Sequence, residues 1–223
     1  DIMPEILEKF KNEGVDVSGE EASWAQTYEN MKVIIENFPT HLPNNYLEYY
    51  LYPNIVVEQS NPEHTRANQI MEGRLQKIDD TVEQIRNGEA TDLDYESSGH
   101  GQYIVDIAAS ILHNKNDRFM LIVPNKGAIP NLREDAVVEV PSYVNAQGVE
   151  PISLRFDIPD FHKGLMEAQV ASEKLLVDAF FENSYQKALE AFTLNQTVPN
   201  ATVAKNVLDD LIEANGDYWP ELN

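Results

Sequence analysis

The chain has 223 residues, of which 42% are hydrophobic, and it carries a net charge of −22 from 16 basic and 38 acidic side chains. This balance is typical of a folded, soluble protein and not of a disordered one. The strong acidity argues against nucleic acid or a membrane surface as a partner, and no apolar run is long enough to cross a bilayer. Because the sequence contains no cysteine, it supplies no disulfide, thiolate metal site or cysteine nucleophile, which fits a reducing compartment.

The first quarter of the chain is predicted to be mainly helical. Apolar residues at helical spacing predict a short helix over residues 2–10, and a second helix begins after Ser18. A tyrosine-rich turn or helix follows from Pro43, with four tyrosines in seven residues. The next segment, NIVVEQ over residues 54–59, is expected to be extended because it is rich in β-branched residues.

A long amphipathic helix is predicted from Pro62 to residue 87, since proline suits the first turn of a helix and Asn-Gly suits its end. Its apolar residues recur at helical spacing, which predicts a buried stripe on one face. The residues of this expected buried stripe are Ile70, Leu75, Ile78, Val82 and Ile85.

The second half of the chain combines short strands with long helices. After a loop over 88–101, a helix is predicted over 102–113, strands over 118–124, 136–146 and 152–156, and helices over 160–182, 184–192 and 200–214. Pro141 interrupts the second strand, which should confine that strand to an edge or a bulge. The order of helices, strands and helices predicts one α+β domain over residues 1–223, helix-rich with a small antiparallel sheet.

The common catalytic motifs are weak or missing in this sequence. Gly99-His100-Gly101 precedes a predicted helix, but no strand comes before it and the third glycine of a dinucleotide-binding loop is missing. The five histidines lack the spacing of metal ligands on a helix. His100 is kept as a weak candidate for substrate binding, because its flanking glycines leave room for a ligand.

Tyr46 and Arg66 are the best candidates from residue chemistry alone. A tyrosine acts as a base only if a neighbouring cation lowers its pKa from about 10. Arg66 should lie in the first turn of its helix, where free backbone amides would assist it in binding an anion. The alternative is that the tyrosines are core or interface aromatics and Arg66 forms a structural ion pair. Residue types alone favour that alternative.

Five segments of the chain resemble glycoside hydrolase family 4, most closely its 6-phospho-α-glucosidase branch. They are YLEYYLYPN, NPEHTRANQIMEGR, NKGAIPNLREDAVVEVPSYV, GLMEAQVASEKLLVDAFF and TVPNATVAKNVLDDLIEANGDYWPEL. The resemblance keeps order and spacing over the whole chain, and it implies the C-terminal part of a larger enzyme. The N-terminal Rossmann domain that binds NAD, and the metal-binding cysteine and histidine, would lie upstream. The implied fold is the C-terminal domain shared with lactate and malate dehydrogenases.

The family resemblance also implies a mechanism and two site residues. In this family NAD oxidises the C3 hydroxyl of the sugar, and a divalent metal, typically Mn²⁺, polarises the resulting ketone. A tyrosine then removes the C2 proton, the aglycone leaves by elimination, water adds and the hydride returns. By its place in PNNYLEYY, Tyr46 matches this base, and Arg66 in HTRAN matches an arginine of the same pocket. With the resemblance included, the catalytic interpretation of this pair is favoured.

The segment from Asn125 to Pro141 is expected to pack against the missing domain; its Lys126 could instead approach the sugar phosphate.

The resulting expectation is a cytoplasmic NAD- and Mn²⁺-dependent 6-phospho-α-glucosidase that acts on a phosphorylated disaccharide such as maltose 6'-phosphate. Its partners would be its own N-terminal Rossmann domain and further copies in a dimer or tetramer, and the fragment alone would be inactive. One alternative is a 6-phospho-β-glucosidase of the same family, and another is a non-catalytic oligomerisation domain. A 2-hydroxy-acid dehydrogenase half is disfavoured by the Tyr46 and Arg66 arrangement.

Overall fold

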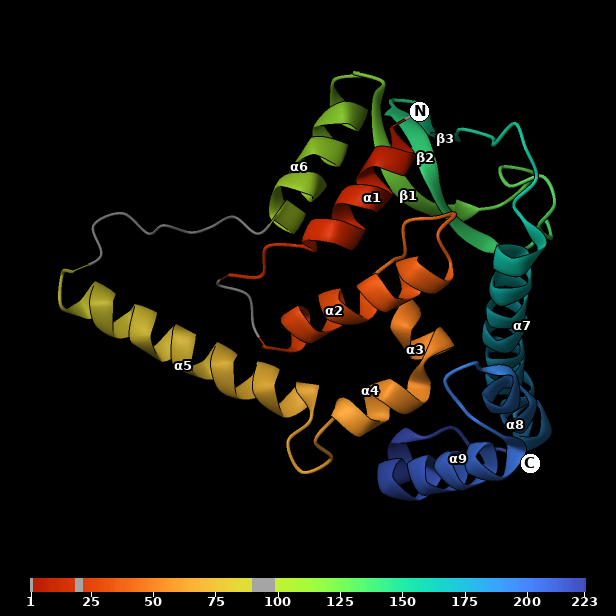
Figure 1. The fold of residues 1–223 in the computed structure, drawn as a ribbon. Coiled ribbons are helices and arrows are strands. Elements are labelled where there is room, and N and C mark those ends of the chain that lie inside the picture. The colour runs from red at the N-terminus through yellow and green to blue at the C-terminus, as the bar shows by residue number, and fades with distance from the viewer. Residues whose placement is uncertain (1, 19–21, 90–98) are drawn as a thin grey trace. The chain divides into compact units, whose positions relative to one another are not determined.

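The computed structural model describes residues 2–18, 22–89 and 99–223. The chain groups into two compact units, Asp1–Leu93 and Asp94–Asn223 (Figure 1). The first unit is helical, and the second joins helices to a three-stranded antiparallel sheet. This confirms the predicted α+β class with a small antiparallel sheet.

The first unit is built around one amphipathic helix. Its helices are α1 (Met3–Glu13), α2 (Ala22–Asn37), α3 (Leu47–Leu51), α4 (Pro53–Gln59) and α5 (Arg66–Arg86). Helix α2 buries Met31, Ile34 and Ile35, whose spacing places them on one face. Helices α1 and α3 both pack against α2, and α3 leads directly into α4.

Two boundaries in the first unit differ from the predictions. The segment NIVVEQ was predicted to be extended but forms α4, because Pro53 occupies the first helical position and outweighs the β-branched residues behind it. The long helix begins at Arg66 and not at Pro62. Thr65 caps it through a reciprocal pair of hydrogen bonds, in which its own backbone N–H donates to Asn68 Oδ1 at 2.9 Å.

The expected burial of the apolar stripe on α5 was wrong. Leu75, Ile78, Val82 and Ile85 are all exposed, by between 40% and 65%. The spacing identifies the apolar face of the helix correctly, but no described part of the chain covers that face.

In the second unit one helix packs on the sheet, and three further helices pack on one another. Its elements are α6 (Gly99–Leu112), β1 (Asp117–Pro124), β2 (Val137–Asn145), β3 (Gly148–Pro151), α7 (Asp160–Glu182), α8 (Tyr185–Leu194), α9 (Ala201–Asn215) and the 3₁₀ turn η1 (Gly216–Tyr218). The strand order is β1-β2-β3, with Leu121 paired to Val140 and Val123 to Val138. The buried Ser110 of α6 donates to the carbonyl of Val144 at 2.7 Å and so attaches α6 to β2.

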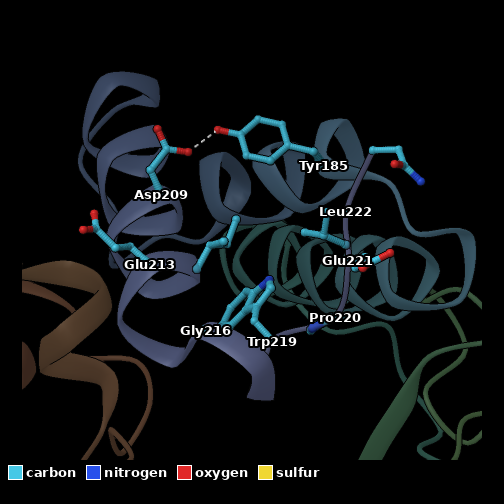
Figure 2. Close-up of a pocket in the computed structure, with 10 residues that line it drawn as sticks. Tyr185, Asp209, Glu213, Gly216, Trp219, Pro220, Glu221 and Leu222 are labelled. Atoms are coloured by element: carbon cyan, nitrogen blue, oxygen red, sulfur yellow. Dashed lines mark hydrogen bonds between the residues drawn. The ribbon is translucent and has the colours of Figure 1, made fainter.

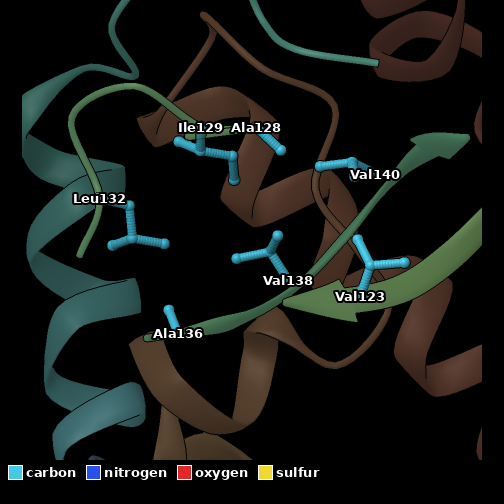
Figure 3. Packing of buried hydrophobic residues seen from close by; sticks show 7 residues of the cluster. All are labelled: Val123, Ala128, Ile129, Leu132, Ala136, Val138 and Val140. Carbon is cyan, nitrogen blue, oxygen red and sulfur yellow. The ribbon is translucent and has the colours of Figure 1, made fainter. Parts of the chain in front are cut away.

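The main core of this unit lies between the sheet and the loop that joins β1 to β2 (Figure 3). Its buried members are Val123, Ala128, Ile129, Leu132, Ala136, Val138 and Val140. The buried Asn125 holds the loop closed: its Nδ2 donates to the carbonyls of Ile129, Leu132 and Arg133 at 3.1, 3.0 and 3.0 Å. A second cluster joins α7, α8 and α9 through Ala179, Ala188 and Leu208.

Two strand predictions need correction. Pro141 lies in the central strand β2 and not in an edge strand. The proline is tolerated because β3 pairs with β2 only as far as Ser142. Beyond that point the backbone N–H of Ile152 donates to the carbonyl of Pro141 at 2.8 Å, and this contact needs no donor from the proline. The strand predicted over 152–156 is instead β3, which ends at Pro151, since Gly148 turns the chain directly into pairing with Asn145.

Candidate functional site

Tyr46 stands immediately before α3 with its side chain 59% exposed. Its backbone N–H donates to Asn44 Oδ1 at 2.6 Å, which fixes the turn that leads into the helix. Its ring stacks on that of Tyr49, with the ring centroids 6.3 Å apart and the planes inclined by 30°. The phenol of Tyr46 is therefore accessible to a ligand while its backbone is held in place.

Glu48 anchors the short helix that follows Tyr46. Its side chain is only 3% exposed, and its two carboxylate oxygens accept hydrogen bonds from Thr27 Oγ1 at 2.9 Å and Asn30 Nδ2 at 2.5 Å. Asn30 Nδ2 also donates to Gln59 Oε1 at 3.0 Å. One network thus ties α3 to α2 and α4. The spacing of residues in the sequence did not identify Glu48 as a buried anchor of this helix. The available signal for that role was a single acidic residue among aromatic and apolar neighbours.

Arg66 lies close enough to Tyr49 to act on it electrostatically. Burial raises the pKa of Tyr49 above its ordinary value, and the negative charge of Glu48 and the Tyr46 phenol add to the rise. The positive charge of Arg66 opposes it. Tyr49 therefore stays protonated at neutral pH and serves as a stacking partner. The structure brings Tyr46, Tyr49 and Arg66 into one neighbourhood, while their catalytic roles stay predictions.

His100 falls in the first turn of α6, and its side chain lies outside the described residues. Its weak assignment to substrate binding stays a prediction. Lys126, also considered for the sugar phosphate, lies in the loop after β1 with a positive φ of 42° and lines a pocket of about 340 Å³ with Asn125 and Pro151. Its role likewise stays a prediction.

A pocket of about 640 Å³ is formed by α8, α9 and the C-terminal segment (Figure 2). The Tyr185 hydroxyl donates to Asp209 at 2.6 Å across its rim, and Lys205 pairs with the same carboxylate. Asp209, Glu213 and Glu221 make its lining acidic. An acidic lining repels a phosphorylated sugar, so this pocket is a poor candidate for the substrate site.

The described residues hold no group of three or more histidine, aspartate or glutamate side chains suited to a metal ion. They also contain no sheet of the parallel, helix-flanked kind that binds dinucleotides. Within the same residues, none of the helices combines the length and the apolar character needed to span a membrane.

Comparison with known proteins identifies the family. The sequence model of the family 4 glycosyl hydrolase C-terminal domain matches residues 1–198. The chain belongs to this family. This confirms the resemblance inferred from the five segments.

Named relatives match the chain along all or most of its length. It is 45% identical over all its residues to the maltose-6'-phosphate glucosidase MalH of Clostridium acetobutylicum, covering 52% of that protein. It is 26% identical over 92% of its residues to the 6-phospho-beta-glucosidase BglT of Thermotoga maritima, also covering 52%. A crystal structure of a 6-phospho-alpha-glucosidase from gut microorganisms, in complex with NAD and Mn²⁺, matches with a TM-score of 0.92 and 42% identity, over 100% of this chain and 52% of that one. The chain therefore spans about half the length of these relatives.

Proposed function

We propose that this chain is the C-terminal part of an NAD- and Mn²⁺-dependent 6-phospho-α-glucosidase. The observation that carries the proposal is the match over the whole chain, at 45% identity, to about half of a maltose-6'-phosphate glucosidase. The weaker 26% identity to a 6-phospho-beta-glucosidase favours the α-anomer over the β-anomer. The substrate would be a phosphorylated disaccharide, and the enzyme would act in the cytoplasm as a homo-oligomer.

The cofactors would be held by the half of the enzyme that lies outside this chain. The described residues fit neither NAD nor a metal ion, because they contain no dinucleotide-binding sheet and no cluster of metal ligands. The enzyme's NAD would supply the oxidation at the sugar C3 that makes the neighbouring C2 proton acidic. This chain would supply the group that takes that proton and part of the wall that binds the sugar.

Tyr46 would be the base that removes the C2 proton. Its phenol is exposed, its backbone is held by Asn44, and the Glu48 network behind it keeps α3 in place. Arg66 would favour the phenolate form of the base or bind an anionic group of the substrate, since a guanidinium stays charged at every relevant pH. Tyr49, with its raised pKa, would remain neutral and fix the plane of the Tyr46 ring.

Replacing Tyr46 tests both the activity and the base. In the chain joined to its upstream half, with NAD and Mn²⁺ present, we expect p-nitrophenol release from a 6-phospho-α-glucoside. Tyr46→Phe should lower kcat by about 10² to 10⁴, the usual contribution of a general base, with a smaller change in KM. The measurement is the initial rate of p-nitrophenol release at saturating cofactors.

Tyr50→Phe is the matched control, because it removes a hydroxyl from the same segment outside the stacked pair and should leave kcat nearly unchanged. Turnover that survives Tyr46→Phe would keep the glycosidase and exclude Tyr46 as its base. Faster turnover of the β-anomer would indicate a 6-phospho-β-glucosidase. No turnover of either anomer would favour a non-catalytic oligomerisation domain.

A further inference from the structure

Tyr46 and Arg66, the two main residues of the proposed site, stand at the beginnings of two helices. Tyr46 immediately precedes α3, and Arg66 is the first residue of α5. A residue at the first position of a helix has no preceding helical turn to support it, so its direction depends on the contacts that begin the helix. The hydrogen bonds at the start of α5 therefore limit where the Arg66 side chain can lie.

Thr65 and Asn68 are joined by hydrogen bonds in both directions, with Arg66 between them in the chain. Asn68 Oδ1 accepts from the backbone N–H of Thr65 at 2.9 Å and from the Thr65 hydroxyl at 2.7 Å. The Thr65 side chain in turn accepts from the backbone N–H of Asn68. Such a pair holds the residue before the helix in an extended conformation, here with φ −74° and ψ 169°. It thereby sets the angle at which the chain enters α5.

A second contact supports the same turn from further along α5. His64 Nε2 lies 2.9 Å from Glu72 Oε2, which joins the residue before Thr65 to the second turn of the helix. The backbone N–H of His64 donates to the carbonyl of Asn61 at 3.2 Å and closes the turn that precedes the helix. The turn is thus attached to α5 at two points, Asn68 and Glu72.

The entry angle of α5 affects how Arg66 meets the tyrosine pair. Arg66 acts electrostatically on Tyr49, whose ring stacks on that of Tyr46. A guanidinium is planar and donates its hydrogen bonds in fixed directions, so its effect on an anion depends on orientation as well as on charge. Greater freedom at the start of α5 would therefore weaken the action of Arg66 even though its charge is kept.

We propose that Asn68 is a positioning residue for Arg66. By capping Thr65 it fixes the start of α5, and thereby the direction of the guanidinium toward Tyr46. The inference rests on the proposed function, because it assigns Asn68 a task in the same reaction. Asn68 acts through Thr65 and Arg66, while the contact between His64 and Glu72 supports the same turn.

Replacing Asn68 in the joined protein tests this role. Asn68→Ala removes the acceptor of both Thr65 donors. We expect kcat/KM for a 6-phospho-α-glucoside to fall by about 5-fold, because placing Arg66 without the cap costs about as much as a cap contributes. Asn68→Gln keeps a neutral amide at the position where capping pairs favour glutamine, and its kcat/KM should stay within about twofold of the parent value.

Gln69→Ala is the matched control on the same turn of α5. Gln69 is exposed, and its side chain takes part in none of the hydrogen bonds found among the described residues. Its replacement by alanine should leave kcat and KM unchanged. Melting temperatures of all the variants are measured beside the rates, which are taken well below the lowest of them.

The form of the loss separates positioning from a purely structural role. A variant that is merely less stable contains fewer active molecules, which lowers the apparent kcat but changes neither KM nor the position of the limbs in the pH profile of kcat/KM. If Arg66 favours the Tyr46 phenolate, Asn68→Ala should move the acid limb of that profile to higher pH. If Arg66 binds an anionic group of the substrate, Asn68→Ala should raise KM. Either change supports the positioning role.

Thr65→Ala with Asn68→Ala tests whether the two residues act together. Because both changes release the same turn, the double variant should lose much less than the product of the two single losses. Losses that simply multiply would overturn the proposal. Kinetics of Asn68→Ala equal to those of Gln69→Ala would also overturn it, whatever the melting temperature, and so would an Asn68→Gln variant as impaired as Asn68→Ala. A parent protein without turnover would contradict the proposed function itself, and this inference with it.

Discussion

In the described part of the chain, Glu48 is the one residue that is buried and has a charged side chain. It lies two positions after the proposed base, Tyr46. Thr27 and Asn30, which donate to its two oxygens, are neutral residues of α2. A buried carboxylate is tolerated only where hydrogen bonds replace its hydration. The backbone that presents Tyr46 therefore depends on a polar contact and not on apolar packing alone.

Removing the Glu48 carboxylate should destabilise the first unit. Glu48→Ala leaves the donors of Thr27 and Asn30 without this acceptor, which should lower the free energy of unfolding by about 2–4 kcal/mol. Glu48→Gln keeps the shape and one acceptor oxygen, and we expect a loss of about 1–3 kcal/mol. Urea unfolding followed by circular dichroism measures both. Glu29→Gln, on the exposed side of α2, is the control; an Ala variant as stable as that control would contradict the role given to the network.

The residues of the proposed site could be selected from the sequence to different degrees. Tyr46 and Arg66 could be selected because their residue types suit the chemistry and because the surrounding words resemble a family. Glu48 could not, because burial of a charged residue depends on partners 18 and 21 positions away on another helix. Spacing along the chain carries no information about such long-range hydrogen bonds.

At the scale of single elements, the sequence predicted best where the ends carry clear signals. The bounds of α7 agree with the prediction, since Pro159 precedes the helix and Asn183, in the left-handed conformation, ends it. Helix α4 was missed because its β-branched residues suggest a strand, whereas Pro53 at its first position begins a helix. The stripe on α5 was located correctly and its burial was wrong, because periodicity identifies an apolar face without identifying what covers it.

The contact between α8 and α9 should weaken in acid. The hydrogen bond from Lys205, and then that from Tyr185, hold the pKa of Asp209 below its ordinary value of 3.8. When folding lowers the pKa of a carboxyl group, the charged group stabilises the folded state at pH values above its pKa in the unfolded chain. This stabilisation is lost as the pH falls through the lower pKa of the folded state. Asp209→Asn should therefore lower the melting temperature slightly at neutral pH, because the group is exposed. The difference from the parent protein should shrink toward zero below pH 3.8.

Calorimetric melting curves across the acidic range would measure this difference. Asp210→Asn, one position further along α9, is the control and should show no such dependence, since Asp210 is exposed and none of the ion pairs or side-chain hydrogen bonds found among the described residues involves it. A difference between Asp209→Asn and the parent that persists unchanged in acid would assign the effect to packing and exclude the ion pair as its cause.

At the scale of the whole molecule, the α+β class could be predicted because the order of helices, strands and helices is visible in the sequence. The position of Pro141 in a central strand could not be predicted, because that position depends on where β3 ends, one residue short of the partner of Pro141. The proposed division of roles between this chain and the rest of the enzyme follows from the residues that the two compact units contain. The first unit contributes a tyrosine and an arginine to the proposed site, while the described residues of both units offer neither a metal cluster nor a dinucleotide-binding sheet.

The chain of 223 residues should therefore have no catalytic activity when it is produced alone. Without the oxidation at the sugar C3, the C2 proton is far too weakly acidic for a tyrosine to remove, however well Tyr46 is placed. We expect no p-nitrophenol from a 6-phospho-α-glucoside with the chain alone, even with NAD and Mn²⁺, and turnover once it is joined to its upstream half. Unfolding in urea would first establish that the isolated chain is folded. Turnover by the folded chain alone would place both cofactor sites within these 223 residues and would overturn the proposed division.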